Sequence, residues 1–67
     1  MVVTLDALYS DPQENMFLLE HLFNISVQQG TTFVLKLDQR EYIFPRSMER
    51  EQRTRHFKEI VERHKPP

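Results

Sequence analysis

Apolar residues recur three or four positions apart through residues 12–29, which is the spacing of an amphipathic helix. The start of this segment carries helix-initiation signals: Asp11 suits the N-cap, Pro12 the first helical position, and Glu14 the acid of a capping box. Gly30 is the only glycine in the chain, and it suits the left-handed position that ends a helix. The pattern therefore predicts a helix over residues 12–29.

The pattern then changes to the alternation of a β-strand over residues 31–37. The face expected to turn inward carries Phe33, Leu35 and Leu37. Lys36 points the other way, which indicates that the opposite face is at least partly wet. A turn at residues 38–40 and a second strand over residues 41–44 would complete a β-hairpin.

A second helix is predicted after Pro45, with Ser47 as its N-cap, and it should reach about His64. At the other end of the chain, residues 2–5 are short and rich in β-branched side chains, which favours an edge strand. A helical turn over residues 4–9 fits that segment as an alternative.

These elements predict an α+β fold in the order (β)-α-β-β-α, with two helices packed on a two- or three-stranded antiparallel sheet. The 67 residues suffice for a single domain, residues 1–67. A core of this size rarely supplies more than about 3–5 kcal/mol of net stability. Because the chain has no cysteine, neither disulfides nor thiolate zinc sites can add to it. We therefore expect self-association or unusually good packing to supplement the core.

The first helix carries more apolar surface than one small sheet needs to cover. Its apolar positions span an arc of roughly 200°, whereas a packed surface helix needs a stripe of about 100° or somewhat more. The surplus could be sandwiched inside one chain, between the hairpin and the second helix. We expect instead a homodimer or partner interface. Its predicted residues are Phe17, Leu18, His21, Leu22 and Ile25, with Asn24 beside Phe17 and His21.

Charge is divided unevenly along a chain whose net charge is −1. Residues 1–35 contain acidic side chains but no Lys or Arg, whereas residues 36–67 contain nine Lys or Arg and six acidic residues. Several of these charges form i,i+4 pairs, which is typical of a solvated helix face. Arg46, Arg50 and Arg53 remain on one predicted helix face. Their heads could reach water or acids of the first helix, or they could bind carboxylates or phosphates of a partner.

No catalytic motif is present: the sequence lacks a glycine-rich phosphate loop, a nucleophile elbow and an H-E-x-x-H motif. His56 and His64 would lie roughly 80° apart around a helix, so they do not converge on a metal. We therefore expect no catalytic residue, no metal and no cofactor. The chain shows no signal peptide and no apolar run long enough to cross a bilayer, so we expect a cytoplasmic protein.

The sequence thus predicts a small non-enzymatic binding or regulatory protein that acts through protein–protein interaction, as a homodimer with an unidentified protein partner. A small nucleic-acid-binding regulator that uses the arginine row is the alternative. This alternative lacks a helix-turn-helix, zinc-finger or RNP-like motif and the overall basic charge of such proteins.

Overall fold

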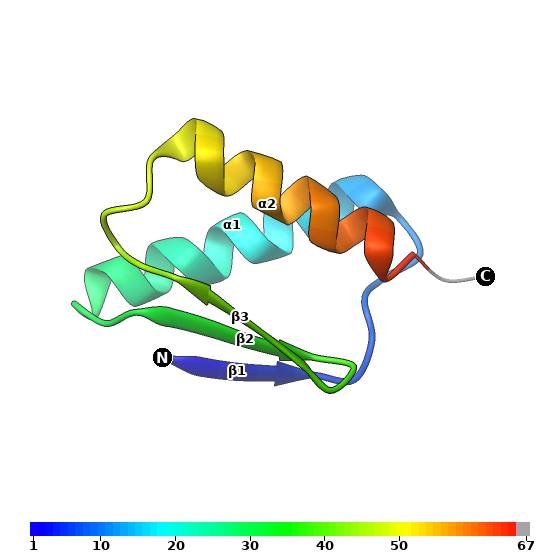
Figure 1. The fold of residues 1–67 in the computed structure, drawn as a ribbon, viewed down its shortest axis with the longest axis horizontal. Coiled ribbons are helices and arrows are strands. Elements are labelled where there is room, and N and C mark those ends of the chain that lie inside the picture. The colour runs from blue at the N-terminus through cyan, green and yellow to red at the C-terminus, as the bar shows by residue number, and fades with distance from the viewer. Residues whose placement is uncertain (66–67) are drawn as a thin grey trace.

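The computed structural model describes residues 1–65, and residues 66 and 67 lie outside the described part. Its elements are β1 (Val2–Leu5), α1 (Pro12–Gln28), β2 (Phe33–Leu37), β3 (Arg40–Phe44) and α2 (Arg50–Arg63). Both helices lie on one face of the sheet, so the molecule has two layers (Figure 1). The predicted α+β fold and element order are confirmed, and the segment after Met1 is a strand. No helix within residues 1–65 is long and apolar enough to span a bilayer.

The sheet has the order β1-β2-β3, and its topology corrects the prediction of a purely antiparallel sheet. β2 and β3 form the expected antiparallel hairpin, but β1 runs parallel to β2. The physical reason is that α1 runs back over the sheet between the two strands, so β2 starts at the same end as β1. A helix that joins two neighbouring strands in this way produces a parallel pair.

Three residues with positive φ mark the turns of the chain. Asp38 (φ 50°) and Gln39 (φ 65°) form a two-residue hairpin turn, in which both central residues have the positive φ that a type I′ turn requires. β3 accordingly begins at Arg40, one residue earlier than predicted. Gly30 (φ 71°) ends α1. Its N–H donates to the Val27 carbonyl, and a second bond from Thr31 to Ser26 completes a Schellman motif.

The two helices begin differently. Asp11 caps α1 as predicted, because its Oδ1 accepts a hydrogen bond from the Gln13 N–H at 2.9 Å. α2 begins at Arg50 with Glu49 as its N-cap, so the prediction of Ser47 as the cap is wrong. Ser47 lies instead in a turn that is closed by the Met48 N–H on the Pro45 carbonyl at 3.0 Å.

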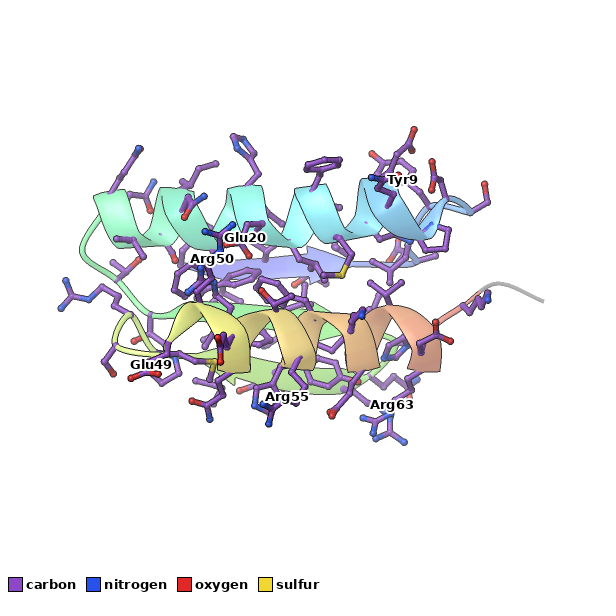
Figure 2. All side chains as sticks on the ribbon, turned by 90° about the horizontal axis from the view of Figure 1, so that it is seen from above. Tyr9, Glu20, Glu49, Arg50, Arg55 and Arg63 are labelled. Carbon is purple, nitrogen blue, oxygen red and sulfur yellow. The ribbon has the colours of Figure 1, made fainter. Side chains whose placement is uncertain are left out.

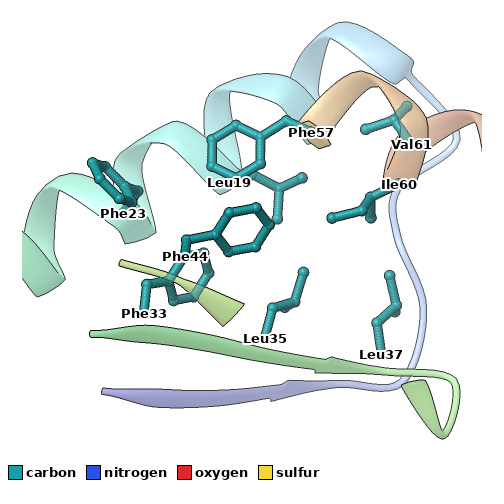
Figure 3. Packing of buried hydrophobic residues seen from close by; sticks show 9 residues of the cluster. All are labelled: Leu19, Phe23, Phe33, Leu35, Leu37, Phe44, Phe57, Ile60 and Val61. Atoms are coloured by element: carbon teal, nitrogen blue, oxygen red, sulfur yellow. The ribbon is translucent and has the colours of Figure 1, made fainter. Parts of the chain in front are cut away.

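The core lies between the two layers (Figure 3). Its buried apolar residues are Leu19 and Phe23 of α1, Phe33, Leu35 and Leu37 of β2, Phe44 of β3, and Phe57, Ile60 and Val61 of α2. The ring of Phe44 links the layers, with ring centroids 5.5 Å from Phe33 and 4.9 Å from Phe57. The inward face predicted for the central strand is therefore confirmed.

The opposite face of the sheet has no helix over it (Figure 1). The strand register places Val2, Val34 and Ile43 in one row across this face. Val2 and Ile43 are 61% and 57% exposed, and Val34 is half-buried. The next row contains Lys36 beside Glu41. This apolar row is a feature that the sequence pattern did not reveal, because it depends on how three separate strands align.

Candidate functional site

The predicted interface residues of α1 divide by burial. Phe17 and His21 are exposed, and Phe17 has the highest exposure of the large apolar side chains in residues 1–65, at 69%. Leu18, Leu22 and Ile25 are half-buried, and Leu22 packs against the core. The sheet and α2 of the same chain thus cover much of the apolar arc, and Phe17 is exposed on the flank of the helix beside that arc. Self-association through this helix stays a prediction.

A groove of about 350 Å³ lies between α1 and α2 on the side away from the sheet. It is lined by Gln13, Met16, Phe17 and Glu20 of α1 and by Arg50 and Thr54 of α2. Glu20 and Arg50 both project into the space between the two helices (Figure 2). The fold therefore brings an aromatic residue and an arginine, predicted separately from the sequence, to the border of one groove.

Arg53 lies beneath this groove and is 9% exposed. Its Nη2 forms an ion pair with Glu20 Oε1 at 2.8 Å, and its Nη1 donates to the Met48 carbonyl at 3.2 Å. The guanidinium also lies 4.3 Å from the centre of the Phe23 ring. A charge so far from water requires a counter-ion and hydrogen-bond acceptors, and Glu20 supplies most of both. Of the two alternatives for the arginine row, Arg53 follows the one that reaches an acid of the first helix.

The other two arginines have different surroundings. Arg50 is the first residue of α2 and borders the groove, whereas Arg46 precedes the helix, exposed in the β3–α2 connection. The Arg46 guanidinium lies beside Gly30, close to the C-terminal end of α1, where a cation is electrostatically favoured. Among residues 1–65 the only ion pair within 4.0 Å is Arg53–Glu20, so neither arginine has an acidic partner at that distance.

A second groove, of about 230 Å³, follows the outer edge of β3 beneath α2. It is lined by β3 from Glu41 to Phe44 together with α2 side chains that include His56, Glu59 and Arg63. Arg55 and Arg63 project from α2 on the side away from α1 (Figure 2). Since α1 packs along the other flank of α2, this groove forms a separate surface.

A hydrogen-bonded cluster closes one end of the second groove. The Tyr42 hydroxyl lies 2.8 Å from His64 Nε2, and Arg63 Nη1 donates to the same hydroxyl at 3.4 Å. Because the Tyr42 oxygen accepts from Arg63, its own proton is free to be donated to a neutral His64. Burial lowers the pKa of His64 below 6.5, and Arg40 and Arg63 lower it further against an opposing effect of Asp38.

No group of three or more His, Asp or Glu side chains in the described part of the chain is placed to hold a metal ion. His56 packs edge-on against Phe44, and His64 is hydrogen-bonded to the Tyr42 hydroxyl. Both imidazoles are therefore engaged with side chains of the same chain.

Asn15 is 2% exposed, and the residue pattern did not single it out. Its side-chain amide forms hydrogen bonds in both directions with the backbone of Tyr9, each at 2.8 Å, and so fixes the β1–α1 connection to the helix. The available signal was its position four residues before Leu19, which places a polar side chain on the buried face. Its role is structural.

No family model matches the chain, and no curated protein or solved structure matches it either. The function therefore has to be inferred from the chemistry of the two grooves.

Proposed function

We propose that this protein is a non-enzymatic interaction protein that binds another protein through the groove between α1 and α2 and works as a homodimer. The observation that carries the proposal is Phe17, which is 69% exposed at the border of a groove that also contains Arg50. Exposed aromatic residues and arginines are the side chains that most often dominate protein–protein binding. The absence of cysteine suits a reducing compartment such as the cytoplasm.

The chemistry of the groove defines the partner surface that would fit it. Met16 and Phe17 offer apolar contact, and Arg50 offers a guanidinium with no acid within 4.0 Å among residues 1–65. Glu20 is already bound by Arg53, so its charge is largely compensated. A partner that presents an apolar side chain next to a carboxylate would match both features. The volume of about 350 Å³ suits a side chain or two better than a large cofactor.

The test compares the proteins captured from the source cell by the tagged wild type and by two variants, Phe17→Ala and Arg50→Glu. Both variants are expected to lose the same captured protein, with at least a tenfold weaker affinity for it once it is purified. Val27→Ala is the matched control, because Val27 is an exposed apolar residue of α1 that does not line the groove. Thermal unfolding should be nearly unchanged in all three variants.

Capture of the same protein by Phe17→Ala and by the wild type would refute a binding role for this groove. The alternative, a nucleic-acid partner, predicts a different result: salt-sensitive retention of nonspecific DNA that decreases in Arg50→Glu. The exposed charges on the outer face of α2 are of mixed sign, with Glu51 and Glu62 beside Arg55 and Lys58, and this favours a nucleic-acid partner less.

A further inference from the structure

The outer edge of β3 presents backbone groups that have no partner in the sheet. Leu37 and Arg40 flank the two-residue turn and so form a hydrogen-bonded pair, after which bonded and non-bonded pairs alternate along the hairpin. The Val34 N–H donates away from β3, to the Met1 carbonyl at 2.8 Å, which agrees with this alternation. The backbone groups that point outward from β3 are those of Glu41 and Ile43.

The two edges of the sheet differ in how far a helix covers them. Seen from above, α1 lies outside β1, whereas β3 extends to the outer side of α2 (Figure 2). A groove of about 230 Å³ runs along β3 on this side. Ile43 at this edge is 57% exposed. An open edge with unpaired N–H and C=O groups is a template for another strand.

We propose that the strand added to β3 is β3 of a second copy of this chain, so that two copies form a continuous six-stranded sheet. The strands pair antiparallel about a twofold axis that passes beside Tyr42. This inference rests on the homodimer in the proposed function and names its surface. It places the contact at the sheet edge and leaves the Phe17 groove free for a partner.

The register follows from the outward-pointing groups. With Glu41 opposite Ile43 of the second copy, each of these residues joins a hydrogen-bonded pair, and the two copies of Tyr42 meet at the axis. A shift in one direction places Glu41 opposite its own copy, where like charges repel. A shift in the other direction places Glu41 opposite Pro45, which has no N–H to donate. The register with Glu41 opposite Ile43 therefore pairs the outward-pointing backbone groups better than either shifted register does.

Charge complementarity favours a second copy as the occupant. Glu59 and Arg63 lie one helical turn apart on the flank of α2 that borders the β3 groove. When β3 pairs with its own copy, the two α2 helices run antiparallel side by side, so Glu59 of each copy faces Arg63 of the other. An acid and a base on one strip are self-complementary under a twofold axis. Association would also supplement a core that is small for an independent domain.

The first test measures the solution mass of the wild type and of two charge variants by sedimentation equilibrium. The wild type should have twice the 8.1 kDa mass of the chain. Glu59→Arg and Arg63→Glu should each weaken the dimer about tenfold, and the double variant should restore it, because the pair is then exchanged and no longer like-charged. A wild type that stays monomeric at millimolar concentration overturns the inference, as does a double variant that is no stronger than the single ones.

The second test needs no substitution and follows amide hydrogen exchange against protein concentration. The N–H groups of Glu41 and Ile43 should exchange rapidly in dilute protein and become at least tenfold slower where the dimer forms. The Tyr42 N–H is the internal control, because it bonds to β2 at every concentration. Equal exchange of Glu41 and Ile43 at all concentrations, or slowing that appears only with a captured foreign protein, contradicts a second copy as the occupant.

The third test uses the absence of native cysteine. Tyr42→Cys should crosslink to a covalent dimer under mild oxidation, since a directly opposed antiparallel pair has the Cα separation that a disulfide needs. Phe17→Cys should form no covalent dimer, and crosslinking there instead would move the contact to α1. A dimer that survives while Phe17→Ala captures the same proteins as the wild type refutes the proposed groove function alone. A monomer whose capture still depends on Phe17 refutes the homodimer and its β3 contact, and leaves the proposed binding role of the groove standing.

Discussion

Arg53 shows how a single charged residue can be part of a core without losing its charge. Its side chain is buried, and its guanidinium reaches Glu20 on α1, the Met48 carbonyl and the face of Phe23. These contacts tie α2 to α1 and to the turn before α2. The desolvation of the guanidinium is offset only while all of these partners are in place.

Arg53→Ala should therefore destabilise the protein by about 2–3 kcal/mol in urea unfolding. This is less than the loss of a fully buried pair, because the Glu20 side chain keeps 34% of its surface exposed to solvent. Arg55→Ala is the control, since Arg55 is an exposed arginine of the same helix, and its effect should stay below about 0.5 kcal/mol. Equal effects of the two substitutions would show that the Glu20 contact adds nothing.

His64 makes stability depend on pH. Its pKa in the folded protein is below 6.5, chiefly because of burial, so the unfolded chain takes up the proton first as the pH falls. The contribution of neutral His64 is fully present above 6.5 and is lost as the pH falls from 6.5 through the lower folded value. His64→Gln should lose less stability than the wild type between about pH 7.5 and about pH 5.5. An unchanged loss would contradict this, and His21→Gln controls for removal of an exposed imidazole.

For the helices and strands, the sequence predicted an element's end correctly where a single residue type meets a requirement of the backbone next to it. Asp11 and Gly30 marked both ends of α1 because capping and positive φ are requirements of the adjacent backbone. Ser47 failed as a cap because its backbone is used by the turn that Met48 closes on Pro45. A residue can cap a helix only where its side chain can accept a hydrogen bond from a backbone N–H in the first turn of that helix.

The hairpin turn offers a direct test at this scale. Gln39 has φ 65°, which is a strained value for a residue with a Cβ atom. Gln39→Gly should raise the free energy of unfolding by about 0.5–1 kcal/mol, because glycine adopts this backbone conformation without steric cost. Lys58→Gly, in the exposed middle of α2, should instead lower it by about 1 kcal/mol. A loss of stability in Gln39→Gly would refute this account of the turn.

At the scale of the whole molecule, the two layers leave two kinds of uncovered surface. The helical side offers the Phe17 groove, and the sheet offers its helix-free face and the outer edge of β3. The prediction of an apolar surplus placed all of it on α1, whereas part of the exposed apolar surface is the row of Val2, Val34 and Ile43 on the sheet. Both the helical side and the sheet side of the molecule therefore offer uncovered surface to a partner.

A homodimer predicts that thermal stability depends on protein concentration, because association stabilises only the folded state. The Tm of the wild type should rise by several degrees between micromolar and millimolar protein. Glu59→Arg should keep the lower Tm over most of that range, because it weakens the contact between the two α2 helices. A Tm that is independent of concentration in both proteins would contradict dimer formation.

The order of the elements and the inward face of the central strand could be predicted from the amino-acid sequence, because each depends on the pattern of residues within one segment. Three features required the packed fold: β1 runs parallel to β2, Arg53 binds Glu20, and Phe17 and Arg50 border one groove. These features join residues from distant segments, and they follow from which elements pack side by side. Periodicity along one segment carries no information about that choice, so packing of the core had to supply it.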